Sequence, residues 1–322
     1  MMNTLSTRRK ARLFGFAIAC WVSLLCINAS ALLFASKAAM AQEDTSDKPE
    51  AIQHAPKDKE EQFAFDRRLN MENEVKDKLF VLMMHRPNYF LPVTYNNNPN
   101  KKVYEGTGKD LPNNLEAKFQ LSLKMLMWEN IFNGQGDLYA AYTQFSLWQI
   151  YEFSSPFRET NFEPELFLKF DTDFNFLGMR NRLLLIGLTH QSNGQDVPLS
   201  RSWNRIYLEF IMAKGNLVLG LKPWYRIPES IESDDNPDID DYLGYGKLFG
   251  AYKMGKHVFS FTLHNNLNLS GNKGALEVGW SYSLSRNLRA YLQYYNGYGE
   301  SLIDYNNFTN RIGLGLMLND WL

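Results

Sequence analysis

The stretch that decides the fold is LLLIGLTHQSNGQDVPLSRSWNRIYLEFIMAK, residues 183–214. It contains two runs in which every second side chain is apolar, a period typical of β-strands. The first apolar row runs on into His190 and Ser192, and the second begins at Asn204. The polar segment between the runs includes the turn-forming pair Asn193-Gly194. The stretch therefore predicts an antiparallel hairpin that carries reactive groups on its apolar face.

A symmetric pairing of this hairpin places Ser192 opposite Ser202 and His190 opposite Asn204. Opposed residues on one face have Cβ atoms about 5 Å apart, so the imidazole and the amide are within reach of a hydrogen bond. A serine hydroxyl becomes a nucleophile when a base accepts its proton, and histidine is such a base at neutral pH. An asparagine can orient the ring. Taken alone, however, a His-x-Ser pair on a strand is more often without a catalytic role.

Runs of similar length and alternation recur along residues 87–322. An even number of strands separated by polar turns is typical of bacterial membrane barrels. We therefore predict an all-β fold, a transmembrane antiparallel β-barrel of about 12 strands, with a secreted β-sandwich as the alternative. The twelve expected strands are Asn88–Tyr95, Glu116–Trp128, Leu138–Tyr151, Pro164–Phe174, Leu183–Ser192, Ser202–Lys214, Leu217–Ile227, Asp241–Met254, His257–Leu269, Ala275–Leu284, Leu288–Tyr295 and Asn307–Leu318.

The N-terminal part of the chain reads as an export signal followed by a polar segment. Residues 1–41 combine a basic start, a long apolar run and the small-x-small site Ala39-Met40-Ala41, which is typical of a signal peptide. The apolar run is also long enough for an uncleaved anchor. Residues 42–86 are expected to form a polar periplasmic lead segment that is either mobile or contains a short helix. With this end in the periplasm, counting strands makes residues 193–201 extracellular and predicts a site near the outer leaflet of the cell outer membrane.

Charge and cysteine content exclude several classes of protein. Both cysteines, Cys20 and Cys26, lie in the signal segment, so the mature chain uses no disulfide. Removal of residues 1–41 takes away five of the 34 Lys and Arg residues and none of the 35 Asp and Glu residues, which leaves a net charge of −6. A nucleic-acid partner is not expected, because it would require a basic patch.

A metal ion would suit the predicted site. Asparagine is neutral and stabilises an imidazolium less than aspartate does, so a cation at the oxyanion position would help to lower the barrier. Hydroxyl and carbonyl oxygens of the connecting loop are ligands that Ca²⁺ prefers. The acidic run Asp234–Asp241 is either a second Ca²⁺ site or, as charge runs more often are, a solvated turn.

Several segments closely resemble the outer membrane phospholipase A family, also called phospholipase A1. The resemblance extends over roughly residues 115–322 and is weak before Glu116. It is carried by six segments, His190–Asn204, Ser154–Asn161, Lys222–Tyr225, Asp235–Asp238, Tyr298–Asn306 and Met317–Asp320.

The resemblance implies a Ca²⁺-dependent outer-membrane hydrolase of phospholipid acyl esters, with phospholipids and lysophospholipids as A1/A2-type substrates. It assigns Ser192 as nucleophile, His190 as general base and Asn204 as orienting residue. The backbone N–H of Gly194 would contribute to the oxyanion hole.

The same resemblance implies a homodimer as the active form. The Ca²⁺ ligands would be the Ser200 hydroxyl, the Gln195 carbonyl and the Ser154 carbonyl of the partner subunit. The family often has arginine where this chain has Gln195, a change that a backbone ligand tolerates but that alters the local charge. Gln144 matches a membrane-embedded glutamine at the dimer interface.

Two other functions remain open from the sequence. A barrel of this size could be a porin or transporter, with Arg205 and Glu209 lining a narrow pore. A non-enzymatic binding barrel is also possible on size and composition, but it gives no reason for a serine, a histidine and an asparagine to meet on the outer surface.

Overall fold

The computed structural model describes residues 64–74, 81–230 and 232–319. These residues belong to one compact unit, Lys59–Leu322. The expected signal peptide, residues 1–41, and the first part of the polar lead lie outside the described residues. None of the helices among the described residues is long and apolar enough to cross a membrane.

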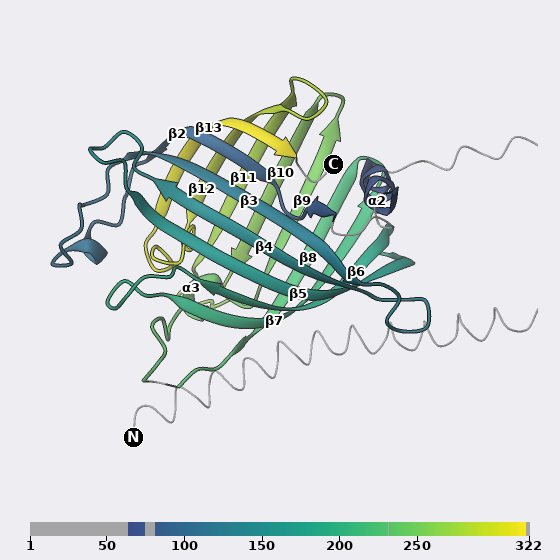
Figure 1. The fold of residues 1–322 in the computed structure, drawn as a ribbon, viewed down its shortest axis with the longest axis horizontal. Helices are drawn as coiled ribbons and strands as arrows, with labels where there is room; N and C mark the ends of the chain where they lie inside the picture. The colour runs from purple at the N-terminus through teal and green to yellow at the C-terminus, as the bar shows by residue number, and fades with distance from the viewer. Residues whose placement is uncertain (1–63, 75–80, 231, 320–322) are drawn as a thin grey trace, which may run out of the picture. The chain divides into compact units, whose positions relative to one another are not determined.

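The described chain forms a closed antiparallel barrel of twelve strands, β2 to β13 (Figure 1). Each strand pairs with its neighbours in sequence, β2 also pairs with β13, and the pairing of β3 with β4 completes the circuit. A short strand, β1 (Leu82–Met84), pairs with β3 beside β2. The barrel strands are β2 (Asn88–Asn96), β3 (Leu115–Trp128), β4 (Asp137–Trp148), β5 (Phe157–Phe176), β6 (Met179–Ser192), β7 (Ser202–Lys214), β8 (Leu217–Ile227), β9 (Gly246–Met254), β10 (His257–Asn265), β11 (Gly274–Ser283), β12 (Arg289–Gly297) and β13 (Thr309–Asn319).

The predicted barrel is confirmed, and two of the expected strand boundaries differ markedly. Strand β5 begins at Phe157 instead of Pro164, because its first residues pair with the end of β4. The expected strand Asp241–Met254 begins only at Gly246, because Asp240–Leu243 form the short helix α3. Two aspartates in the first turn of α3 favour a helix start. Gly244, with φ of 68°, ends it.

The barrel is apolar on its outer surface. On β13, Ile312 and Leu314 are 50% and 58% exposed, whereas Arg311, the residue directly before Ile312, is 2% exposed. This arrangement reverses the usual burial pattern of a soluble protein, and it is the one expected of strands that face lipid outside and a polar lumen inside. The outward side chains of β13 therefore form an apolar row, as a transmembrane barrel requires.

The lumen is occupied by paired charges. The buried carboxylate of Glu165 contacts Arg86 at 2.6 Å and Lys222 at 3.2 Å. Glu209 also pairs with Lys222, at 3.3 Å, and Arg205 pairs with Glu163 at 3.0 Å. Arg205 and Glu209, which would line a pore in the porin interpretation, are thus held in ion pairs. A cavity of about 250 Å³ remains among the lumenal side chains of the described residues.

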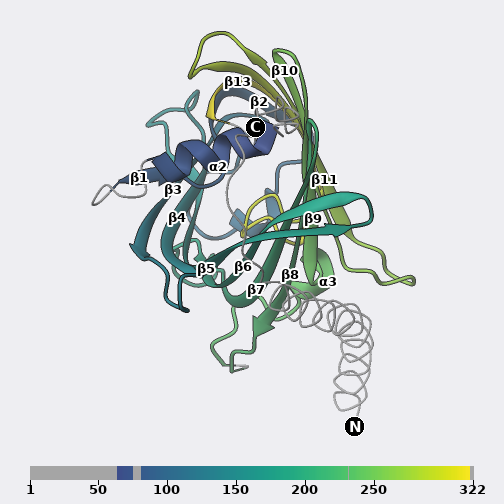
Figure 2. The same ribbon diagram turned by 90° about the vertical axis from the view of Figure 1, so that its right-hand side faces the viewer.

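A helix from the polar lead contributes to the lumen. Helix α2 (Ala64–Glu74) buries Phe65 and Leu69 in a cluster that also contains aromatic and aliphatic side chains of the barrel wall. Asp66 forms an ion pair with Arg182 at 2.8 Å, and Glu72 forms one with Lys124 at 2.7 Å. Figure 2 shows α2 between the walls of the barrel.

The two ends of the barrel differ in the length of their connections. Turns of two residues, such as 177–178 and 255–256, lie at one end, and connections such as 97–114 and 228–245 lie at the other. Short turns are periplasmic and long loops extracellular in outer-membrane barrels. The connection 193–201 belongs to the extracellular end, as the strand count predicted.

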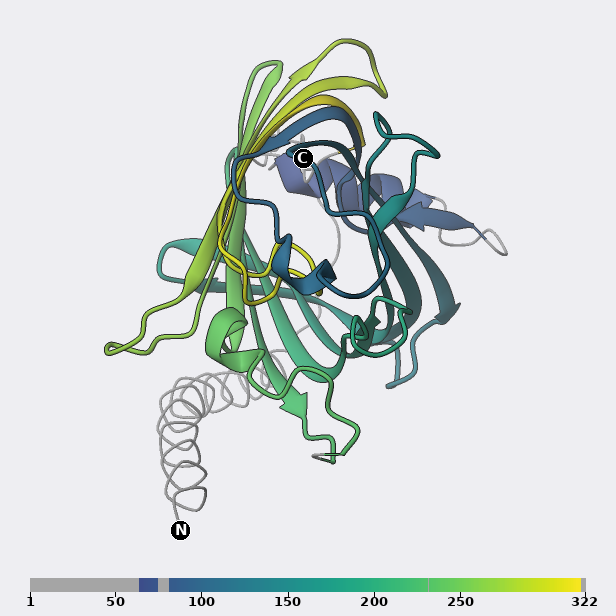
Figure 3. The same cartoon turned by 90° about the vertical axis from the view of Figure 1, so that its left-hand side faces the viewer.

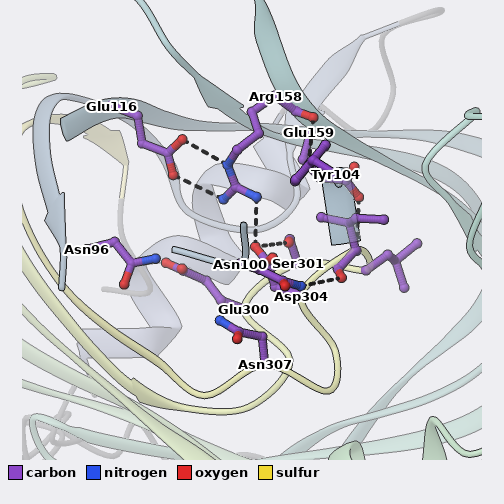
Figure 4. Close-up of polar contacts among 12 residues, drawn as sticks. Asn96, Asn100, Tyr104, Glu116, Arg158, Glu159, Glu300, Ser301, Asp304 and Asn307 are labelled. Atoms are coloured by element: carbon purple, nitrogen blue, oxygen red, sulfur yellow. Dashed lines mark hydrogen bonds and ion pairs between the residues drawn. The ribbon is translucent and has the colours of Figure 1, made fainter. Parts of the chain in front are cut away.

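Two extracellular loops meet over the lumen (Figure 3). Asn307 in loop 298–308 donates to the carbonyl of Asn98 in loop 97–114, at 3.0 Å. Beneath them, Arg158 bridges Glu116 of β3 and Asp304 of loop 298–308, with distances of 2.9 and 3.0 Å (Figure 4). The loops are thereby tied to the barrel wall by buried ion pairs.

The outward apolar face of β6 gives a first prediction. Ile186 lies midway along β6 and faces outward, so Ile186→Arg places a charge in lipid and should cost about 2–4 kcal/mol. Ile186→Leu keeps the apolar surface and should assemble normally. Urea unfolding in lipid bilayers measures both variants. Equal stability of the two variants would contradict the assignment of this face to lipid.

Candidate active site

Strands β6 and β7 bring His190 and Asn204 together on the outside of the barrel. The two residues are direct cross-strand partners, and His190 Nδ1 lies 2.9 Å from Asn204 Oδ1. Ser192 pairs with Ser202 two positions further along. The register is the one that the symmetric hairpin predicted.

The inward face of the same hairpin is packed in the lumen. Trp203 and Tyr207 are 0% and 1% exposed, and the Arg205 guanidinium lies over the Trp203 ring. Tyr207 fills the space beside Gly187, where an added Cβ would approach its ring to 2.5 Å. The close fit holds β6 and β7 together behind the reactive groups.

Ser192 occupies the outward face next to His190 along β6. It is partly exposed, and its cross-strand neighbours are Phe162 on β5 and Ser202 on β7. Among the hydrogen bonds of the described residues, none joins the Ser192 hydroxyl to the imidazole ring. The bond from Nδ1 to Asn204 leaves Nε2 as the ring atom that is free to act as a base toward a serine.

Asn193 organises the loop that follows Ser192. Its buried side chain donates to the carbonyl of Leu199 at 2.8 Å and accepts from the backbone N–H of Arg201 at 2.9 Å. It also contacts the Glu159 carboxylate of β5, at 3.4 Å. Gly194 is exposed with φ of 61°, a left-handed conformation that strains other residues. The loop therefore holds the Gly194 peptide in a fixed position next to Ser192.

Loop 228–245 braces the other end of this loop. The Ser200 hydroxyl donates to a carboxylate oxygen of Asp235, and the backbone N–H of Ser202 donates to Asn236 Oδ1 at 2.9 Å. Burial and the neighbouring Asp238 raise the pKa of Tyr305, whose hydroxyl donates to that aspartate. The contact between Ser200 and Asp235 could not be predicted from the sequence, since nothing in the pattern joins two residues of different loops that are 35 positions apart.

The oxygen atoms here suit a hard cation. No group of three or more His, Cys, Asp and Glu side chains is arranged as a metal site among the residues that the structure describes. The Ser200 hydroxyl, the adjacent Asp235 carboxylate and the Gln195 carbonyl are oxygen donors of the kind that Ca²⁺ takes. The Gln195 side chain points toward Lys109 and accepts a hydrogen bond from its Nζ at 2.6 Å. The backbone carbonyl of Gln195 is therefore the group of this residue that could bind a cation.

Gln144 lies on β4, and Ser154 lies in the connection between β4 and β5. Gln144, Phe162 and Ser192 are successive cross-strand partners on β4, β5 and β6, so Gln144 is level with Ser192 on the outer surface. Among the described residues, the Gln144 amide forms hydrogen bonds only with Tyr142 and Ser146 of its own strand. Ser154 is in the exposed turn that follows β4 and has φ of 63°. The chain itself does not bring Ser154 into contact with Ser200 or Gln195.

The fold and its outer surface define an outer-membrane β-barrel. Residues 65–318 match the family model described as Phospholipase A1. The chain belongs to the phospholipase A1 family, and it is an outer-membrane protein.

Individual relatives agree with this assignment. The chain is 43% identical to a phospholipase A1 of Klebsiella pneumoniae, over 76% of this chain and 84% of the relative. It is 44% identical to a phospholipase A1 of Escherichia coli K12, over 76% of this chain and 83% of the relative.

Solved structures show the same fold. The outer membrane phospholipase A of Escherichia coli superposes with a TM-score of 0.71 at 42% identity, covering 76% of this chain and 95% of that chain. The outer membrane phospholipase of Salmonella typhi, described as a dimer with bound calcium, superposes with a TM-score of 0.70 at 42% identity, covering 76% and 94%.

The role of Asn193 gives a second prediction. Asn193→Ala removes a buried set of hydrogen bonds and should cost about 1–3 kcal/mol of stability. Amide hydrogen exchange of residues 194–201 should become faster, because the loop loses its internal anchor. Asn175→Ala, at an exposed position of β5, is the matched control. Unchanged exchange in the Asn193 variant would show that other contacts hold the loop.

Proposed function

We propose that this protein is a Ca²⁺-dependent phospholipase that hydrolyses acyl esters of phospholipids and lysophospholipids at the lipid-facing surface of its barrel. The observation that carries the proposal is the 2.9 Å contact between His190 and Asn204 on an apolar outer face that also bears Ser192. Polar groups in an outward apolar row are costly in lipid, so their presence there points to a function. A membrane lipid can reach this face directly, without entering the barrel.

The first half of the reaction forms an acyl-enzyme. His190 Nε2 accepts the proton of the Ser192 hydroxyl as its Oγ attacks the ester carbonyl, and Asn204 Oδ1 holds the ring through Nδ1–H. The Gly194 N–H donates to the oxyanion. Collapse of the tetrahedral intermediate breaks the ester C–O bond, and His190 returns its proton to the departing alcohol of the lysophospholipid.

The second half uses water. His190 removes a proton from a water molecule that attacks the acyl carbonyl, and the Ser192 oxygen leaves with that proton, which releases the fatty acid. When bound, Ca²⁺ would supply positive charge to the oxyanion, held by the Ser200 hydroxyl, the Gln195 carbonyl and the Ser154 carbonyl of the partner subunit. Asp235, next to Ser200, would add negative charge on the same side of the loop.

The active form in this proposal is a homodimer. An amide that faces lipid favours a partner, and Gln144 is level with Ser192 on the same outer surface. Pairing through this surface would bring the partner's Ser154 close to the Ca²⁺ loop. Phospholipid is scarce in an outer leaflet of lipopolysaccharide, so pairing around phospholipid acyl chains would confine hydrolysis to a perturbed membrane.

Substitutions of the three side chains test the mechanism. Ser192→Ala and His190→Ala should each lower kcat about a thousandfold or more, and Asn204→Ala should lose less because nucleophile and base remain. Ser202→Ala, at the residue directly opposite Ser192, should retain activity. Fatty-acid release from phosphatidylcholine micelles is the measurement, with heat-modifiable gel mobility as the test of folding. Near-normal hydrolysis by a folded Ser192→Ala variant would exclude this serine as nucleophile.

Metal and dimer dependence can be separated. Chelation by EDTA should abolish hydrolysis and added Ca²⁺ should restore it. Gln144→Ala should reduce activity at low protein concentration and recover at high concentration, since it weakens pairing and leaves each site intact. Gln120→Ala, at a glutamine that lines the lumenal cavity, is the control. Full activity of a preparation that crosslinking shows to be monomeric would contradict the dimer requirement.

A further inference from the structure

Asn204 has a second partner, which lies on the side away from His190. Its Nδ2 donates to Glu229 Oε1 at 3.2 Å, while its Oδ1 faces the imidazole. Glu229 lies in loop 228–245, just after β8, and is half-buried. Three side chains from β6, β7 and this loop therefore form one hydrogen-bonded row, His190–Asn204–Glu229.

We infer that Glu229 is a positioning residue of the reaction, which orients the Asn204 amide and supplies the negative charge that the asparagine lacks. This inference rests on the proposed function. In a serine triad with aspartate, the carboxylate fixes the tautomer of the imidazole and stabilises the imidazolium that forms. Here Asn204 fixes the tautomer of the imidazole, and Glu229 supplies the negative charge.

The orientation follows from the chemistry of the groups. An asparagine amide presents an acceptor at one end and a donor at the other, and an ionised carboxylate only accepts. With Glu229 as the acceptor, the NH₂ group of Asn204 is turned toward the loop and Oδ1 is turned toward His190. The ring must then carry its proton on Nδ1, which leaves Nε2 unprotonated to act on Ser192.

The charge of Glu229 is not cancelled by a neighbouring cation. Arg226, the basic residue closest to it in sequence, pairs instead with Asp234 at 2.7 Å. No ion pair to Glu229 is formed within residues 64–74, 81–230 and 232–319. The loop that holds it is anchored at Asp234 by Arg226 and at Asp238 by Tyr305. The Glu229 carboxylate can therefore stabilise the imidazolium through the Asn204 amide.

Substitution of Glu229 separates orientation from charge. Glu229→Gln keeps an oxygen acceptor for Asn204 and removes the charge, and it should lower kcat about fivefold with KM unchanged. Glu229→Ala also removes the acceptor and should lose more. Glu232→Gln, an exposed glutamate of the same loop, should match the wild type. Hydrolysis of phosphatidylcholine in detergent micelles with saturating Ca²⁺ measures all variants.

A double substitution excludes a merely structural role. In Asn204→Asp the introduced carboxylate lies against that of Glu229, and the repulsion should lower activity. Adding Glu229→Gln to Asn204→Asp should raise activity, although the same change lowers it in the wild type. A loss of equal size in both backgrounds, or a Glu229→Gln variant equal to Glu232→Gln, would overturn the inference. A folded wild-type protein that hydrolyses no phospholipid would overturn the proposed function itself and the inference with it.

Discussion

The closed hydrogen-bonded circuit of twelve strands is the constraint on which the rest of the structure depends. In lipid no water is available for an unpaired backbone group, so the sheet must have no free edge. Closure requires that β2 meets β13 and β3 meets β4, and it separates an apolar outside from a polar inside. The candidate site lies on the outside, where its side chains break an apolar row.

The paired charges of the lumen are the second consequence of closure. Side chains that point inward cannot reach bulk water freely, and a buried charge without a partner is costly. Glu165 and Glu116 each hold two basic side chains, and loop 298–308 adds Asp304 to the second group. The result is a rigid scaffold, which supports the outer site and does not resemble a conduit.

The sequence was sufficient for features that depend on local alternation. The strands and the pairing of His190 with Asn204 follow from a period of two and a symmetric hairpin. The start of β5 was missed because Glu159 and Glu163 face an ionic lumen, so the apolar alternation is absent there. The contact of Asn204 with Glu229 was missed because the geometry of a long loop is set by tertiary contacts.

The reactive pair and the barrel seam differ greatly in sequence separation. His190 and Asn204 are 14 residues apart in one hairpin, whereas the seam joins residues such as Asn96 and Arg311. Local contacts form early in folding and distant ones late, because closing a long loop costs more entropy. The pair can therefore assemble before the chain is a finished barrel. During biogenesis, the proposed requirement for a second subunit would keep such an immature hairpin from attacking the lipids it first meets.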